Sequence, residues 1–281
     1  MSELLTELQA TAFRMGGCDP KWLKNAAVPE FKTVEKDSQV SGQPELLLLH
    51  GLMGAISNWD AIQPIFDTYS HSIAFHFPIL TGHSSEITVK SLGVLTEAFI
   101  RTRKLSPVSI CGNSLGGHVA MRLALARPEL IDCLVLAGTS GLYEHSVDSL
   151  PVRPDRKFIR DQMDRVFFNK SLINDEAVES LYSVLTKKSH VLSIIQSARS
   201  AKKDNLLTLL PHIKCPVLLL WGEEDKITTM DVAEKFKAHL PNAKLITKKG
   251  CGHAPMIEHP EWFSEEVHKF LQEHSRFYKK V

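Results

Sequence analysis

Apolar and polar residues follow two patterns along this chain, one typical of buried strands and the other of amphipathic helices. Short continuous apolar runs predict strands covered on both faces, and they occupy residues 46–49, 72–77, 108–110, 131–137, 215–221 and 243–247. Segments with helical spacing occupy residues 2–15, 88–104, 118–126, 231–239 and 260–274. This alternation predicts an α/β fold, with a mostly parallel central sheet and helices on both faces.

The alternation stops between residues 142 and 205, where no convincing strand occurs. Three helical patterns take its place, at residues 155–168, 174–186 and 189–202. Helices cannot extend a sheet, so we expect residues 142–205 to form a helical cap inserted over the strand ends. The core then consists of residues 44–141 and 206–281, and residues 1–43 form an N-terminal helix and edge strand packed on it.

The composition is that of an ordinary soluble protein. The 281 residues are 43% hydrophobic and 23% charged, enough for one large α/β domain with an insertion. Lys and Arg number 33 against 32 Asp and Glu, and no long block of like charge occurs. Nothing in this balance points to a nucleic-acid partner.

Cysteine usage and hydropathy predict a cytoplasmic protein. The five cysteines are odd in number and scattered, which favours reduced thiols over a disulfide framework or metal site. The first residues lack the basic and apolar regions of a signal peptide. The longest apolar runs fall well below the roughly 20 residues of a membrane helix, so we expect no stable membrane insertion. The sequence carries no signal for an oligomeric state.

A strand-to-helix turn carries the first candidate for chemistry. Residues 112–116 read Gly-Asn-Ser-Leu-Gly between a β-branched run and a helical pattern, as in a G-x-S-x-G nucleophile elbow. Such a turn strains the serine backbone, and Gly112 and Gly116 stand where a Cβ would clash. We predict that the Ser114 hydroxyl is lifted clear of the sheet, beside the positive end of the following helix.

Two later strand exits carry the partners that a serine nucleophile needs. Residues 221–225 read Trp-Gly-Glu-Glu-Asp after one buried strand, and residues 250–253 read Gly-Cys-Gly-His after the last. A neutral imidazole must take the hydroxyl proton, and a carboxylate fixes the tautomer of that imidazole. Ser114, Asp225 and His253 supply these roles, in the chain order expected of this architecture.

Over about residues 44–275 the chain resembles the α/β-hydrolase fold superfamily. The resemblance lies in four motifs that occur in register, His-Gly, Gly-Asn-Ser-Leu-Gly-Gly, Trp-Gly-x-x-Asp and Gly-His. It implies a serine-nucleophile hydrolase with a helical cap. Carried over residue by residue, it makes Ser114 the nucleophile, Asp225 the acid and His253 the base.

The resemblance also implies how the rest of the site is built. Backbone N–H groups of Leu52 and Leu115 would form the oxyanion hole. In this family the histidine before the oxyanion loop usually holds the shape of that loop, which makes His50 a supporting residue. The other residues expected to support the site are Gly51, Gly112, Asn113 and Gly116.

One loop departs from the family pattern. The family carries Asp-x-x-Gly-His-Gly after its second core strand, whereas residues 79–84 read Ile-Leu-Thr-Gly-His-Ser. The missing acid and final glycine alter the geometry expected of this loop. They leave the three catalytic candidates untouched.

Other polar residues have to be weighed against these candidates. Glu223 and Glu224 are carboxylates beside Asp225, and we interpret both as part of a solvated loop. His259 fits the start of a helix. His118 opens the elbow helix, where we expect it to pack or hydrogen-bond near the loops.

The serine nucleophile narrows the reactions that this fold supports. Epoxide hydrolases and dehalogenases of the fold attack with an aspartate, which is not the residue here. We favour hydrolysis of a carboxylic ester with a small or medium apolar acyl group, through an acyl-enzyme on Ser114, because the predicted cap has a broad apolar face. Side chains and backbone supply every group that this reaction needs, so we expect no cofactor and no metal.

Two alternatives stay open. The elbow is similar to that of hydrolases that cleave carbon–carbon bonds in vinylogous diketones from aromatic-ring degradation. Those enzymes generally carry Trp after the catalytic histidine, where this chain has Ala254, and an arginine for which we find no counterpart. The alternative of another class is a ligand-binding protein of this fold without turnover. The complete set of triad and oxyanion motifs argues against that alternative.

Overall fold

A seven-stranded sheet organises the chain in the computed structural model, which describes residues 2–18, 20–35, 45–53, 56–81, 87–105, 107–143 and 153–278. The strands are β1 Thr33–Glu35, β2 Glu45–Leu49, β3 His71–Phe75, β4 Val108–Asn113, β5 Ile131–Ala137, β6 Val217–Gly222 and β7 Ala243–Lys248. Their order is β1-β3-β2-β4-β5-β6-β7, and all neighbours are parallel except β1 and β3. The prediction of a mostly parallel sheet is confirmed.

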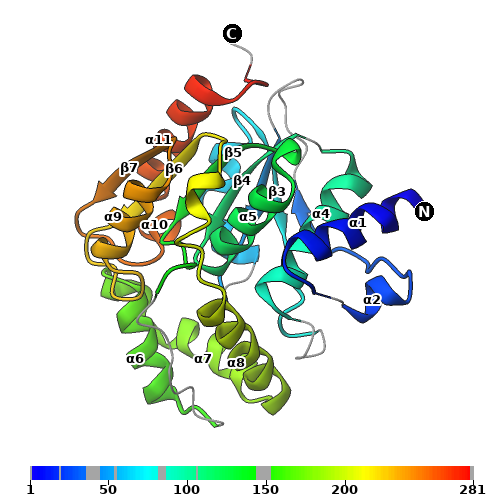
Figure 1. The fold of residues 1–281 in the computed structure, drawn as a ribbon. Coiled ribbons are helices and arrows are strands. Elements are labelled where there is room, and N and C mark those ends of the chain that lie inside the picture. The colour runs from blue at the N-terminus through cyan, green and yellow to red at the C-terminus, as the bar shows by residue number, and fades with distance from the viewer. Residues whose placement is uncertain are drawn as a thin grey trace.

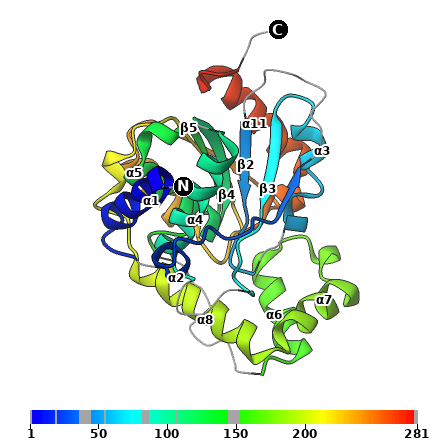
Figure 2. The same ribbon diagram turned by 90° about the vertical axis from the view of Figure 1, so that its right-hand side faces the viewer.

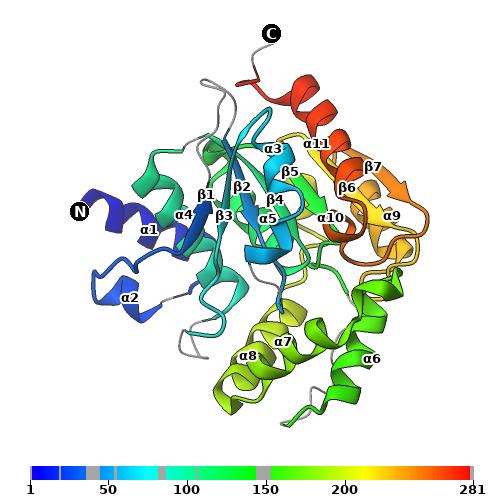
Figure 3. The same cartoon turned by 180° about the vertical axis from the view of Figure 1, so that it is seen from behind.

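Helices cover both faces of this sheet. They are α1 Ser2–Arg14, α2 Lys21–Lys24, α3 Gln63–Phe66, α4 Val89–Arg103, α5 Leu115–Ala126, α6 Arg156–Val166, α7 Asp175–Leu185, α8 Lys188–Lys203, α9 Met230–His239, α10 Pro255–Glu258 and α11 Pro260–His274. Helices α4, α5 and α9 lie on the face seen in Figure 1, and α3 and α11 lie on the opposite face, seen in Figure 3. In the described ranges no helix is both long and apolar enough to cross a membrane.

The central strand β2 shows why its sequence is a continuous apolar run. Successive side chains of a strand point to opposite faces, and here both faces are buried. Leu47 and Leu49 join the core under α4 and α5, whereas Leu46 and Leu48 join the core under α3 and α11. All four leucines have 0% exposure, so none of these four positions selects for a polar residue, whereas Glu45 at the start of the strand is only half-buried.

The helices α6, α7 and α8 connect β5 to β6 and lie together at one end of the molecule (Figures 1 and 2). Two of them begin at side-chain caps, because Asp155 accepts the N–H of Phe158 and Asn174 accepts that of Ala177. The three predicted helices of this segment are therefore present. The division of the chain into core and cap stays a prediction, and its residues 144–152 and the 36–44 boundary lie outside the described residues.

Some elements differ from the pattern. Helix α5 begins at Leu115, three residues earlier than predicted. Gly116 and Gly117 have a low helix propensity, so the sequence pattern did not indicate the first turn, which tertiary packing makes helical. Helices α2, α3 and α10 have four residues each, which is too short to show a periodic pattern.

The start of α5 lies so close to β2 that only glycine fits. A Cβ on Gly116 would lie 2.1 Å from the carbonyl oxygen of Leu49. We predict that Gly116→Ala lowers the free energy of unfolding by at least about 3 kcal/mol, because backbone atoms on both sides have to move. Denaturant unfolding followed by circular dichroism measures this loss.

Gly93→Ala is the matched control. A Cβ there would meet the end of the flexible Met15 side chain, which can move aside, and alanine favours the helical backbone of α4. We expect a change within about 1 kcal/mol of the wild type. A Gly116→Ala protein as stable as the Gly93→Ala protein would contradict the packing described here.

Candidate active site

Ser114 stands at the turn between β4 and α5 in a strained conformation. Its φ is +52° and its ψ is −117°, a combination that residues with a side chain rarely adopt. Its N–H donates to the carbonyl of Ala137 at 3.0 Å, and its carbonyl accepts the N–H groups of His118 and Ser140, both at 3.2 Å. These bonds hold the strained residue in place, which is the backbone geometry expected of a nucleophile elbow.

His253 and Asp225 form a buried pair. The Nδ1 atom of His253 lies 2.8 Å from Oδ2 of Asp225, and the two residues are 7% and 4% exposed. The other carboxylate oxygen of Asp225 accepts the N–H groups of Ile227 at 2.8 Å and Thr228 at 2.9 Å. These bonds hold the carboxylate in a fixed position against Nδ1 of His253, an arrangement in which a carboxylate can keep an imidazole in the tautomer protonated at Nδ1.

The backbone around Gly138 and the side chain of Asn113 bring the serine and the histidine to one junction. A Cβ on Gly138 would lie 3.0 Å from Nδ1 of His253 and 3.1 Å from Oδ2 of Asp225. The preceding carbonyl, that of Ala137, binds the N–H of Ser114 and the side-chain amide of Asn113. The same amide also donates to the carbonyl of His253 at 3.2 Å. The residues predicted from three separate strand exits therefore meet at the carboxyl end of the sheet.

His50 holds the loop that follows β2. Its Nε2 accepts the N–H of Phe77 at 3.0 Å, so Nδ1 carries the ring proton and donates to the carbonyl of Gly51 at 2.8 Å. Burial lowers the pKa of His50 to about 4, which keeps the ring neutral at physiological pH. The hydrogen bonds agree with the supporting role predicted for His50.

The hydrogen bond from His50 also directs the N–H of Leu52. The carbonyl and the N–H of one peptide unit point in opposite directions, so the N–H of Leu52 points away from the His50 ring. Gly51 packs directly on the elbow, since a Cβ there would lie 3.2 Å from Cβ of Ser114. Leu115 is the first residue of α5, and its N–H has no acceptor within the helix. Gly54 and residues 82–84, which belong to the predicted loops nearby, lie outside the described residues.

Two residues at this junction, Thr228 and Glu258, were not predicted from the sequence. The hydroxyl of Thr228 donates to Oδ2 of Asp225 at 2.9 Å, and the spacing Asp-x-x-Thr is a local signal that could have revealed it. Glu258 accepts the N–H of Gly252 at 2.7 Å with one oxygen, and those of Phe168 and Asn169 at 2.9 and 2.8 Å with the other. No sequence signal indicates Glu258, because two of its three donors, Phe168 and Asn169, come from a distant segment of the chain.

The rival residues have other partners. Glu224 is half-buried and accepts the N–H of Cys251 at 3.0 Å, so its interpretation as a solvated loop residue is wrong: it binds the loop that carries His253. Glu223 is exposed, as predicted. His259 precedes α11 and contacts the carbonyl of Gly250 at 2.9 Å through Nε2.

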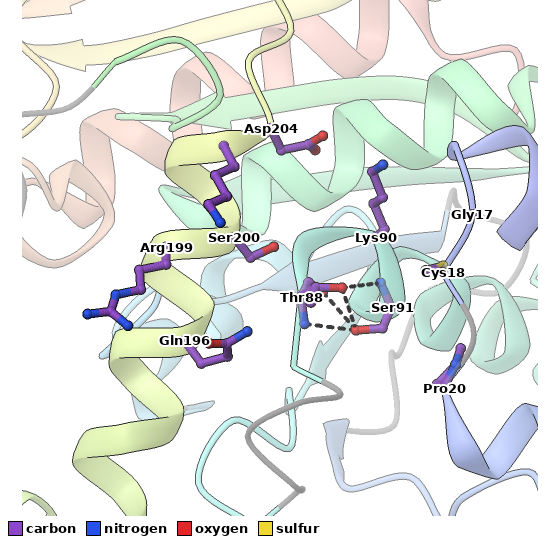
Figure 4. A pocket seen from close by; sticks show the side chains of 11 residues that line it. Gly17, Cys18, Pro20, Thr88, Lys90, Ser91, Gln196, Arg199, Ser200 and Asp204 are labelled. Carbon is purple, nitrogen blue, oxygen red and sulfur yellow. Dashed lines mark hydrogen bonds between the residues drawn. The ribbon is translucent and has the colours of Figure 1, made fainter.

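A cavity of about 470 Å³ lies between α4, α8 and the residues after α1 (Figure 4). Its walls carry the cationic side chains Lys90, Arg199 and Lys203, with Asp204 at the end of α8. None of the predicted site residues lines it. In the described part of the chain no three His, Cys, Asp or Glu side chains are grouped in a way that would hold a metal ion.

Comparison with known proteins agrees with this architecture. A model of the alpha/beta hydrolase family matches residues 46–266. The chain therefore belongs to the alpha/beta hydrolase family.

Two of its relatives are hydrolases of different kinds. The chain is 29% identical over 245 residues to a pimeloyl-[acyl-carrier protein] methyl ester esterase of Nitrosomonas europaea, covering 78% of this chain and 92% of the esterase. It is 31% identical over 205 residues to a 2-hydroxy-6-oxononadienedioate/2-hydroxy-6-oxononatrienedioate hydrolase of Cupriavidus pinatubonensis, covering 68% and 69% of the two chains.

Solved structures show the same fold. An alpha/beta hydrolase enzyme, MGS-MChE2, from the metagenome of sediments of the Mar Chica lagoon superposes with a TM-score of 0.70 at 28% identity, covering 87% of this chain and 96% of that one. The meta-cleavage product hydrolase CumD of Pseudomonas fluorescens has a TM-score of 0.75 at 19% identity, covering 87% and 94%. At that identity the second likeness concerns the fold alone.

The burial of neutral His50 predicts a pH dependence of stability. As the pH falls from 6.5 towards about 4, the unfolded chain gains a proton at this residue that the folded protein does not bind. The contribution is complete above pH 6.5 and is lost on acidification through this window, in total on the order of 3 kcal/mol. We predict that His50→Gln removes one proton from the slope of unfolding free energy against pH. Denaturant unfolding of both proteins at a series of pH values tests this, and equal slopes would contradict it.

Proposed function

We propose that the protein is a serine hydrolase that cleaves a carboxylic ester of a small or medium apolar acyl substrate. One observation carries the proposal. The buried pair of His253 and Asp225, 2.8 Å apart, lies at the same junction as the strained Ser114. A histidine oriented by a carboxylate beside a strained serine is the arrangement that activates a hydroxyl for acyl transfer.

In the first step of this reaction the Ser114 oxygen attacks the ester carbon and His253 takes the hydroxyl proton. The tetrahedral intermediate collapses when its bond to the alcohol breaks, and His253 returns the proton to the leaving alkoxide. An acyl-enzyme on Ser114 is left. Water then attacks the acyl carbon with His253 again as base, which releases the acid and restores the serine. Asp225 orients the ring and stabilises its cationic form in both steps.

The negative charge on the intermediate needs donors that are fixed in advance. We assign this role to the backbone N–H groups of Leu52 and Leu115, supported by His50, Gly51, Gly112, Asn113 and Gly116. The N–H of Leu115 also lies at the positive end of α5. One donor of this kind contributes about 3–4 kcal/mol to the transition state in a serine protease.

The substrate class is inferred from α6 and from a relative. Ile159 and Met163 are buried, and Phe158 packs on the same apolar cluster. We propose that α6–α8 act as a cap that excludes water from an uncharged acyl group. The pimeloyl-[acyl-carrier protein] methyl ester esterase, whose name states an ester substrate, supports this choice.

Hydrolysis of a carbon–carbon bond is the second candidate, because several relatives carry names of such enzymes. These substrates are vinylogous diketones. The Ser114 oxygen would attack a ketone carbonyl while His253 takes its proton, the carbon–carbon bond would then break with protonation of the leaving carbon, and water would hydrolyse the acyl-enzyme. Ala254, where those enzymes generally carry Trp, favours the ester.

We predict that Ser114→Ala lowers kcat for a nitrophenyl ester by at least about 10³-fold while the protein stays folded, because the nucleophile is lost. Asp225→Asn should lower kcat by about 10⁴-fold, the loss known for the corresponding change in a serine protease. Ser109→Ala is the matched control, since this buried serine lies on β4, the strand that leads to Ser114, and its hydroxyl donates to Asp132. Full activity of Ser114→Ala would overturn the assignment.

A labelling experiment separates an enzyme from a binding protein of this fold. A fluorophosphonate should modify Ser114 of the folded protein, and peptide mass spectrometry locates the adduct. Side-by-side rates on short- and medium-chain nitrophenyl esters and on a dienoate ring-cleavage product then distinguish the two hydrolases. We expect the ester kcat/KM to exceed that for the dienoate. The opposite ranking would favour carbon–carbon hydrolysis, and a protein that neither reacts with the probe nor turns over either substrate would be non-catalytic.

A further inference from the structure

A second set of serine, histidine and aspartate, formed by Ser140, His118 and Asp204, lies near the backbone of Ser114. The hydroxyl of Ser140 lies 3.4 Å from Nδ1 of His118, and Nε2 of His118 lies 3.2 Å from Oδ2 of Asp204. His118 has 0% exposure, and Ser140 and Asp204 are also buried. Asp204 borders the cavity of Figure 4, whereas His118 and Ser140 are not among the residues that line it, so we look for their role in the residues that they contact.

The charge of Asp204 sets the direction of the hydrogen bonds. Burial by itself would raise the pKa of Asp204, but its contacts with His118 and the hydrogen bonds from Arg122 outweigh it and hold the pKa at about 2. The ionised carboxylate cannot donate and lies 3.2 Å from Nε2 of His118, so its charge favours the tautomer with the ring proton on Nε2, although the geometry is not that of a hydrogen bond. Nδ1 is then an acceptor, and the hydroxyl of Ser140 donates to it.

Ser140 connects this set to the nucleophile. Its backbone N–H donates to the carbonyl of Ser114 at 3.2 Å, and the N–H of His118 donates to the same carbonyl at the same distance. The position of the Ser140 side chain therefore affects a bond that holds the strained backbone of Ser114.

Asp204 connects the set to α8, at whose end it lies (Figure 4). Arg122 of α5 donates to Asp204 through Nε at 2.6 Å. The chain that leaves β5 and the chain that returns from α8 are also joined, because Leu206 donates its N–H to the carbonyl of Gly141 at 2.8 Å. A Cβ on Gly141 would lie 3.4 Å from the ring of His118, so both chains close around this histidine.

We propose that His118 is a positioning residue that links the end of α8 to the backbone of Ser114 through Ser140. The inference rests on the proposed role of Ser114 as nucleophile. His118 touches no reacting atom. It fixes the hydroxyl of Ser140, and Ser140 in turn fixes the carbonyl of the strained serine, so that the hydroxyl of Ser114 keeps its angle to His253.

The test is the rate at which a fluorophosphonate labels Ser114 in the full-length protein, measured together with the melting temperature. His118→Leu removes both ring contacts, and we expect labelling about 10-fold slower, less than the roughly 100-fold that a displacement of 1 Å can cause. His118→Asn keeps an acceptor near the Nδ1 position for Ser140. It should recover a rate within about threefold of the wild type although its contact with Asp204 is lost.

Arg122→Met is the matched control for docking of α8. It removes the bidentate ion pair to Asp204 but leaves His118 and Ser140 in place. We expect a lower melting temperature with labelling within about twofold of the wild type. If His118→Leu does not fold, Ser140→Ala tests the same link by removing only the hydroxyl, and it should slow labelling about 10-fold.

The outcomes are distinct. Three results would overturn the positioning role while Ser114 remains the reactive residue. The first is labelling at the wild-type rate in His118→Leu or its substitute Ser140→Ala. The others are equal losses of rate in His118→Leu and His118→Asn, or an equal loss in Arg122→Met. Failure of the wild-type protein itself to react would overturn the proposed function, and the positioning role with it.

Discussion

The close approach of α5 to the ends of β2 and β4 is the constraint on which the site depends. Two glycines make it possible, because a Cβ on Gly112 or Gly116 would lie 2.5 or 2.1 Å from the nearest backbone atom of the other element. With the helix start pressed against the sheet, Ser114 has to adopt a positive φ. The same contact places the N–H groups of the first turn beside the serine. Backbone strain, helix dipole and hydroxyl orientation thus follow from one packing contact.

Three buried histidines near this contact show how environment decides the role of one residue type. His50 donates to a backbone carbonyl and accepts from a backbone N–H, and its low pKa leaves it neutral. His253 faces a carboxylate through Nδ1, the contact on which its proposed role as a base rests. His118 faces a carboxylate through Nε2 and a hydroxyl through Nδ1. Only the arrangement around His253 suits a general base.

The sequence predicted the features that local pattern encodes. Strands covered on both faces appear as apolar runs such as residues 46–49, and the strand exits drew attention to Asp225 and His253, which form the buried pair described above. The role of Ser114 and of the oxyanion groups stays a prediction. Contacts between distant segments could not be foreseen. Residues 118 and 204 meet across 86 positions, and nothing near either one in the chain indicates the other.

The hydrogen bonds of the Glu258 carboxylate couple the position of α6 to that of the His253 loop. It joins the loop of His253 to the residues after α6, and the N–H of His253 also donates to the carbonyl of Val166 at 2.7 Å. An outward displacement of α6 would therefore also displace the imidazole of His253. The far end of α8 is tied to α4, since the N–H of Val89 donates to Ser200 at 3.1 Å. Helix α7, between these two anchored ends, has only Val178 and Leu185 buried. Helix α7 is in turn paired with α6 through Arg156–Glu179 and Arg160–Asp175, so a displacement of these helices as one body would be transmitted to the loop that carries the imidazole.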